Sequence, residues 1–233
     1  MIGGAPERLM ERVRAEKAVW LFCGDSITQG ALHTGGFRDY VELLAERVRF
    51  ELHKPLHIFV NTAYSGDTTR EILAQIEYRV IRFDPDIFSL MIGMNDAHLN
   101  RNITLDEFRR NTCSIVGRVR ESTSAQIILQ TTCAVVPALA PERPRFPEYM
   151  DVVREVALEL DTALVDHHAE WEKIRTKDPT RYESWMANPI HPNALGHWVF
   201  AEKLMNYFGF GPLENCVPPR PLAHVASGEG NKR

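Results

Sequence analysis

The chain has 233 residues, of which 44% are hydrophobic and 25% are charged, and its formal net charge is -4. This length and composition fit one α/β domain with a sizeable core. Basic residues are interspersed with acidic ones and form no continuous positive stripe, which argues against nucleic acid as a partner. No stretch approaches the roughly 18 uncharged apolar residues of a membrane span, and the N-terminal segment lacks the apolar core of a signal peptide. We therefore expect a cytoplasmic protein.

Five short apolar runs are typical of buried parallel strands, because each is followed by turn residues and then by a helical pattern. The runs are Ala18–Gly24, His57–Ala63, Asp86–Gly93, Gln126–Thr132 and Ala163–His167. Their alternation with helices predicts a doubly wound α/β sheet that is covered on both faces.

Two of the intervening helices carry apolar stripes with the 3.6-residue period of an amphipathic helix. The stripes are Phe37, Tyr40, Val41, Leu44 and Val48, and then Leu105, Phe108, Thr112, Ile115 and Val119. Two capping boxes, Thr68 with Glu71 and Thr104 with Glu107, predict where helices begin. The last helix is predicted over Asn193–Phe208.

Two segments are predicted to lie outside the regular layers. Pro137–Pro147 is rich in proline, so it is expected to be a surface loop at the rim of the site. Gly211–Arg233 is rich in proline, glycine and charge, and is expected to be a C-terminal tail that is flexible or contacts a partner. We thus expect a single domain over 1–210 and a tail over 211–233, with a homo-oligomer possible through that tail.

The cysteines and paired histidines give little indication of a metal site. The four cysteines form no CxxC pair, and we expect reduced thiols at Cys23, Cys113, Cys133 and Cys216. The adjacent side chains of His167 and His168 diverge, and no third ligand follows at a recognisable spacing. We expect no metal and no cofactor.

Polar segments follow the first three apolar runs, where an open parallel sheet places its ligands. They are Gly24–Gly30 (GDSITQG), Asn61–Asp67 (NTAYSGD) and Gly93–Asp96 (GMND). Taken singly, such residues are common in strand-to-helix turns, and the first segment lacks the glycine spacing of a nucleotide-binding loop. A fourth segment, Asn188–Asn193 (NPIHPN), precedes the last helix, from which His191 can reach a serine of the first loop.

These four segments, in this order, resemble the blocks of the SGNH hydrolases, also called GDSL esterases and lipases. Gly24-Asp25-Ser26 resembles the first block with its nucleophile, and Gly66 the glycine of the second. Gly93-x-Asn95-Asp96 resembles the third block, and His191 with its following Pro-Asn the last. The resemblance spans most of the chain and implies a flavodoxin-like three-layer αβα sandwich with a five-stranded parallel sheet.

The resemblance also implies roles for these residues. Ser26 would attack an acyl carbonyl and His191 would take its proton, which agrees with the need of a serine hydroxyl for a neighbouring base. Backbone N–H groups of Ser26 and Gly66 and the Asn95 side-chain amide would stabilise the oxyanion. Asp25 and Asp96 are expected to support their loops.

One position departs from the family pattern. Family members usually have an aspartate three residues before the histidine, and here that position is Asn188. Three explanations compete: Asn188 accepts a hydrogen bond from His191, a backbone carbonyl near Asn188 or Pro189 orients the ring in a Ser-His dyad, or the protein has lost activity. Asp166 is expected to cap the following helix and not to replace the acid.

The leading hypothesis is hydrolysis of a short-acyl ester, with an acetyl ester of a carbohydrate or small metabolite as substrate. Thioesterase or lysophospholipase activity is the alternative within the same family. A non-catalytic ligand-binding member of the fold stays open because of Asn188. A phosphate-ester or nucleotide hydrolase is a further alternative, and it predicts dependence on a metal.

Overall fold

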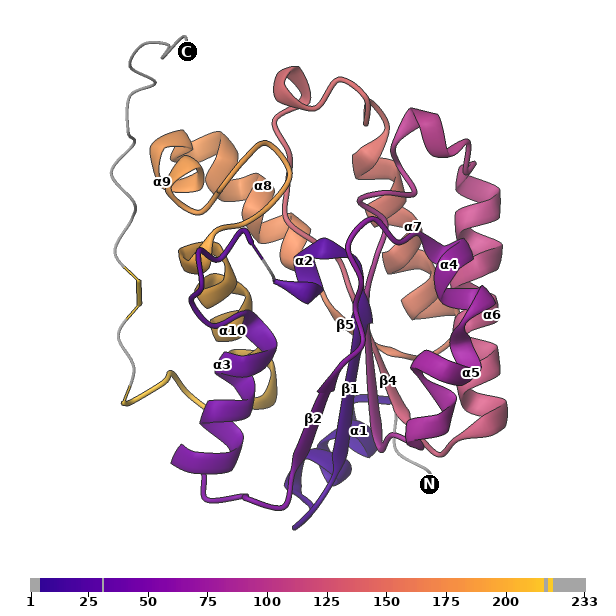
Figure 1. Ribbon diagram of the computed structural model, residues 1–233, viewed down its shortest axis with the longest axis vertical. Helices are drawn as coiled ribbons and strands as arrows, with labels where there is room; N and C mark the ends of the chain where they lie inside the picture. Colours follow the sequence, from indigo (N-terminus) through magenta and orange to yellow (C-terminus); the bar gives the residue numbers. More distant parts are fainter. Residues whose placement is uncertain (1–4, 31, 216–217, 220–233) are drawn as a thin grey trace, which may run out of the picture.

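A computed structural model describes residues 5–30, 32–215 and 218–219 (Figure 1). Its five strands form one parallel sheet in the order β2-β1-β3-β4-β5. The strands are β1 (Val19–Gly24), β2 (Ile58–Asn61), β3 (Ile87–Met91), β4 (Gln126–Gln130) and β5 (Ala163–Val165). All five lie within the predicted runs, so the expected doubly wound α/β sheet is confirmed.

Helices cover both faces of this sheet, which gives three layers. Figure 1 shows α3 and α10 on one side of the strands and α4 to α7 on the other. The α-helices are α1 (Ala5–Arg14), α2 (Ser26–Gln29), α3 (Tyr40–Glu46), α4 (Thr69–Ala74), α5 (Ile76–Arg79), α6 (Leu105–Ser122), α7 (Phe146–Glu159), α8 (His167–Lys177), α9 (Pro179–Ser184) and α10 (Ala194–Phe208). Shorter segments are the π-helical η1 (Arg47–Glu51) and the 3-10 helices η2 (Ile81–Phe83), η3 (Leu99–Arg101) and η4 (Pro137–Leu139).

The central strands are mostly apolar because helices bury them from both sides, and the buried polar pair Gln130 and Ser89 is joined by a hydrogen bond. Every residue of β3 is buried, whereas the edge strand β2 leaves Ile58 55% exposed. Aromatic side chains make up much of the core: Trp20 stacks on Phe59 and meets the edge of Phe208. The contact between Trp20 and Phe208 holds the end of α10 against β1.

The first predicted apolar stripe is wrong at its first member. Phe37 lies before α3 and is 60% exposed. Helix α3 begins at Tyr40, because Asp39 accepts hydrogen bonds from two backbone N–H groups and forms a capping box with Glu42. Tyr40 and Val41 are buried as predicted.

The two predicted capping boxes differ in outcome. Thr68 and Glu71 form both reciprocal bonds at the start of α4. At the start of α6 the Thr104 hydroxyl accepts from the Glu107 N–H, but the Glu107 carboxylate binds Arg70. The second box is therefore only half formed, since an arginine competes for its carboxylate.

The proline-rich loop and the start of the tail both pack on the domain. The loop contains the 3-10 helix η4 and leads into α7 at Phe146, with Pro147 in the first turn. Leu213 is buried, and the backbone N–H groups of Glu214 and Asn215 bind Glu51. Most of the remaining tail lies outside the described residues.

The strand order places a topological switch point between β1 and β3, where ligands bind in open α/β sheets. The loops after these two strands therefore define the edge at which to look for chemistry. Within the described residues, no helix is both long and apolar enough to cross a membrane.

Candidate active site

Ser26 lies in the tight turn between β1 and α2. Asp25 caps α2 by accepting a hydrogen bond from the Ile27 N–H at 3.0 Å, so Ser26 is the first residue of the helix. A Cβ at Gly24 would lie 2.3 Å from the carbonyl oxygen of Met91, which explains why glycine precedes the Asp-Ser pair. The turn holds Ser26 at the carboxyl edge of the sheet, where the residue is 6% exposed.

The turn after β2 holds Gly66 with a backbone N–H directed to no acceptor among the described residues. The neighbouring N–H groups are all engaged: Tyr64 donates to Gly24, Ser65 to the Gln29 side chain, and Asp67 to Tyr64. Gly66 has φ +86°, a conformation that residues other than glycine rarely adopt. The turn thus leaves one donor available.

Charged side chains hold this turn in place. Arg79 forms a buried ion pair with Asp67, and its guanidinium also donates to the Thr62 carbonyl at 2.7 Å. Arg101 donates to the Gly66 carbonyl at 2.8 Å. The two bonds to the carbonyl oxygens of Thr62 and Gly66 fix the orientation of peptide groups in this turn.

Asn95, after β3, reaches the same turn. Its amide Nδ2 donates to the Asp67 carbonyl at 2.9 Å, which leaves the second amide hydrogen for another acceptor. The next residue, Asp96, accepts from the Thr69 N–H at 2.9 Å and from its hydroxyl at 2.6 Å. Asp96 thereby connects the Asn95 loop to the start of α4, and burial raises the pKa of Asp96 to about 6.

The structure brings Ser26 and His191 together from positions 165 residues apart. His191 Nε2 lies 2.8 Å from Ser26 Oγ, and His191 Nδ1 lies 3.0 Å from Asn188 Oδ1. Both ring nitrogens are therefore engaged in one chain of hydrogen bonds, Asn188 to His191 to Ser26.

The Asn188 amide is oriented by its own turn. Its Oδ1 also accepts hydrogen bonds from the backbone N–H groups of Ile190 at 3.1 Å and His191 at 3.0 Å. An amide nitrogen in that position would face two donors, so the oxygen must face the ring. His191 Nδ1 therefore carries the proton, and Nε2 is left as the acceptor for the Ser26 hydroxyl.

The surroundings of His191 favour its neutral form. Burial, followed by the charges of His33 and Arg143, lowers the pKa of His191 to about 4. Asp25 has the opposite perturbation, because burial raises its pKa to about 7. In the part of the chain that the structure describes, neither Asp25 nor Asp96 is hydrogen-bonded to His191, and both carboxylates accept from backbone N–H groups.

Sequence reasoning missed two residues beside the catalytic candidates. The ring of His33 stacks on that of His191, with centroids 3.6 Å apart and an angle of 6° between the planes. Arg143, from the proline-rich loop, is buried and donates to the Met94 carbonyl at 2.9 Å. Neither residue belongs to a motif, so no signal in the sequence could have found them.

The other polar candidates have structural partners. Asp166 caps α8 and binds Arg154 at 2.8 Å. His167 Nε2 bonds to Gln130 at 2.8 Å, and burial lowers the pKa of His167 to about 3. The described residues contain no cluster of three or more potential metal ligands, and Cys23, Cys113 and Cys133 are free thiols, whereas Cys216 lies outside the described part.

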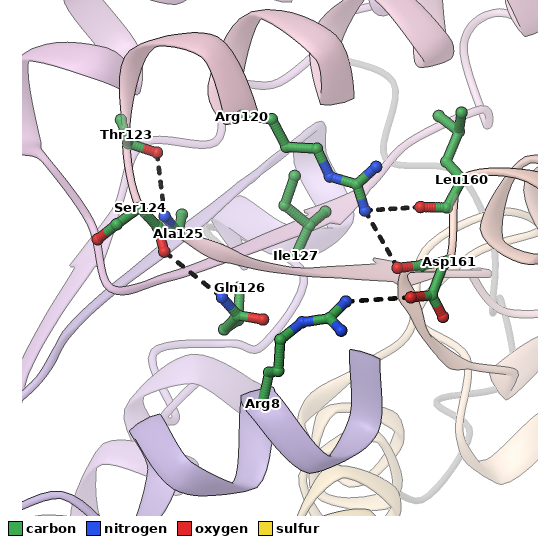
Figure 2. A pocket seen from close by; sticks show the side chains of 9 residues that line it. All are labelled: Arg8, Arg120, Thr123, Ser124, Ala125, Gln126, Ile127, Leu160 and Asp161. Carbon is green, nitrogen blue, oxygen red and sulfur yellow. Dashed lines mark hydrogen bonds and ion pairs between the residues drawn. The ribbon is translucent and has the colours of Figure 1, made fainter. Parts of the chain in front are cut away.

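A cavity of about 360 Å³ lies at the opposite end of the sheet, near the start of β4 (Figure 2). Its arginines are engaged: Arg8 forms an ion pair with Asp161, and Arg120 donates to the carbonyl oxygens of Leu160 and Asp161. No histidine lines it. The Ser26 edge is therefore the better candidate for catalysis.

Comparison with known proteins shows which family the chain resembles. The model of the GDSL-like lipase/acylhydrolase family matches residues 22–199. An acetylxylan esterase from Geobacillus stearothermophilus is 29% identical over 211 residues, which are 82% of this chain and 93% of that enzyme. Its crystal structure aligns with a TM-score of 0.71 and 26% identity, covering 85% of this chain and 97% of that one.

Further solved structures show the same fold. Those of the Geobacillus esterase include catalytic mutants in which a serine, an aspartate or a histidine is replaced by alanine. An alpha/beta hydrolase enzyme from the metagenome of Lake Arreo, Spain, aligns with a TM-score of 0.72 and 25% identity, covering 85% of this chain and 98% of that one. With the family model matching most of the sequence, the chain belongs to the GDSL-like lipase/acylhydrolase family of carboxylic ester hydrolases, the SGNH hydrolases.

Proposed function

We propose that this protein removes acetyl groups from carbohydrate esters through an acetyl-enzyme on Ser26. The observation that carries the proposal is the hydrogen-bonded chain in which Ser26 Oγ lies 2.8 Å from His191 Nε2 and Asn188 Oδ1 lies 3.0 Å from Nδ1. A serine becomes a good nucleophile when such a base accepts its proton.

Acylation proceeds in two steps at the ester carbon. Ser26 Oγ forms a bond to the carbonyl carbon while its proton moves to His191 Nε2, and the carbonyl oxygen becomes an oxyanion. The oxyanion then collapses, the bond to the sugar oxygen breaks, and His191 gives its proton to that oxygen. Water repeats the sequence on the acetyl-enzyme and releases acetate, so substrate and water supply every atom that is transferred.

Three donors suit the oxyanion. They are the backbone N–H of Ser26, the N–H of Gly66 and the second amide hydrogen of Asn95. The turn of Gly66 is held by the Arg79–Asp67 ion pair and Asn95 is held by the Asp67 carbonyl, so these donors are fixed before the charge develops. Such preorganisation is usually the largest single contribution to catalysis.

Asn188 fits an active enzyme better than an inactive binding protein. The main damage expected from asparagine in place of aspartate is selection of the wrong imidazole tautomer. Here two backbone N–H groups direct the Asn188 oxygen to the ring, which selects the tautomer that can accept the serine proton. What asparagine does not supply is the negative charge that stabilises an imidazolium.

The substrate class is supported by the relative. The Geobacillus protein, 29% identical across nearly all of its length, is an acetylxylan esterase. We therefore infer an acetylated oligosaccharide as substrate, and not a thioester or a lysophospholipid.

The test is a comparison of leaving groups and acyl groups. We expect kcat/KM of the purified protein to be highest for release of acetate from acetylated xylo-oligosaccharides. It should be at least about tenfold lower for butyrylated xylo-oligosaccharides, acetyl-CoA and lysophosphatidylcholine. The activity should survive a chelator, since no step uses a metal. Faster hydrolysis of acetyl-CoA or lysophosphatidylcholine would overturn the substrate assignment, and loss of activity with chelator would overturn the mechanism.

A further inference from the structure

His33 contacts His191 on the face of its ring, where neither of the hydrogen-bonding partners acts. Ser26 and Asn188 bond the two ring nitrogens, at 2.8 and 3.0 Å. These bonds act on two atoms at the ring edge and leave both faces of the ring without a contact from either partner. The ring of His33 stacks on one face, with centroids 3.6 Å apart and planes within 6° of parallel, and so opposes tilting of the His191 ring.

We propose that His33 is a positioning residue that holds the plane of the His191 imidazole in line with Ser26. The proposal rests on the proposed function to the extent that His191 acts as the base. A family aspartate would hold its histidine with a charged hydrogen bond, which is stronger and more directional than the neutral bond from Asn188. The contact of His33 with the face of the His191 ring adds a second restraint on ring orientation, which the neutral hydrogen bond from Asn188 restrains only weakly.

The loop that carries His33 is held in place at its ends and at the residue next to His33. Its ends meet, because a Cβ at Gly30 would lie 2.4 Å from the Cβ of Asp39. Between them, the Gly35 N–H donates to the Leu32 carbonyl at 3.2 Å, and Thr34 is buried although Leu32 is 90% exposed. The loop is thus closed and anchored at Thr34, directly beside His33.

The charges that face His191 define how the contact depends on pH. They are His33 on its face, Arg143 from the proline-rich loop, and His197 of α10, whose own pKa is lowered to about 3 by burial and by the charges of His33 and His191. A proton on His33 puts a positive charge against the face of His191 and opposes formation of the imidazolium.

The test compares His33→Ala with His33→Phe, which keeps a flat ring but no charge. The primary readout is the rate at which a fluorophosphonate probe labels Ser26, because labelling needs only an activated serine; kcat and KM for p-nitrophenyl acetate are measured beside it. We expect His33→Ala to reduce the labelling rate and kcat by about tenfold or more, with KM changed less than about twofold. His33→Phe should recover most of the rate.

The pH profile provides a readout that loss of stability alone would not move. In both variants the acid limb of kcat/KM should shift to higher pH, because the positive charge facing His191 is gone and its pKa rises. Leu32→Ala, in the same loop and exposed, is the matched control and should behave as wild type.

Two outcomes would overturn the proposal. One is a labelling rate of Ser26 in His33→Ala equal to that of the wild type, and the other is a labelling rate in His33→Phe as low as that in His33→Ala. Failure of the proposed function looks different, since wild type would then label with the probe but release no acetate from acetylated oligosaccharides.

Discussion

Replacing Ser26 with alanine is expected to lower kcat for p-nitrophenyl acetate by at least about 10³-fold, because no other hydroxyl is hydrogen-bonded to His191 among the described residues. His191→Ala should lower kcat by a similar factor. The double variant should be no slower than either single variant, because the nucleophile and the base act as one unit. Initial rates at pH 8 check this, corrected for the uncatalysed reaction.

Ser122→Ala is the matched control for that series. Ser122 is an exposed serine at the end of α6, remote from the loops of the site, and its loss should leave kcat unchanged. Additive losses in the double variant would show that Ser26 and His191 act independently, which contradicts the hydrogen-bonded pair.

The second large effect is expected at Asn188. Asn188→Ala removes the acceptor for His191 Nδ1 and for two backbone N–H groups, so kcat should fall by about 10²-fold as the ring loses its orientation. Asn188→Asp keeps an oxygen that can accept all three hydrogen bonds, and it adds a negative charge that stabilises the imidazolium. We expect kcat to rise about tenfold at pH 8.

The pH profile of kcat/KM separates charge from geometry at this position. In the wild type, activity should fall as pH drops through about 4, because the pKa of His191 is about 4 and its protonated form cannot accept the serine proton. Asn188→Asp raises that pKa, so its acid limb should lie at higher pH. Ala187→Asp, which places a carboxylate at an exposed neighbouring position, is the control and should have a much smaller effect. An unchanged rate and profile in Asn188→Asp would contradict the assigned contact.

Much of the fold could be predicted because its determinants are local in sequence. Strands buried on both faces are continuous apolar runs, and a capping box such as Thr68–Glu71 marks a helix start within four residues. The predicted stripe is wrong at Phe37, although the same kind of signal, Asp39 with Glu42, marks the true start of α3. The half-formed box at Thr104 could not be foreseen, because the competing Arg70 comes from another helix.

The site could be predicted where its residues belong to ordered motifs. Ser26, Gly66, Asn95 and His191 belong to such motifs, and the structure brings Ser26 next to His191 and Asn95 next to the Gly66 turn. Their catalytic roles stay a prediction. The orientation of the Asn188 amide depends on two backbone N–H groups of a folded turn, so the sequence left three explanations open. His33 meets His191 across 158 residues of sequence, and only tertiary structure makes them neighbours.

The most direct test of the account is to label the purified protein with a fluorophosphonate probe and identify the modified residue by peptide mass mapping. We expect one stoichiometric adduct on Ser26. It should be absent in Ser26→Ala, form much more slowly in His191→Ala and form at the wild-type rate in Ser122→Ala. A folded wild-type protein that stays unlabelled, or one labelled at another residue, would contradict the claim that His191 and Asn188 activate Ser26 for attack on an ester.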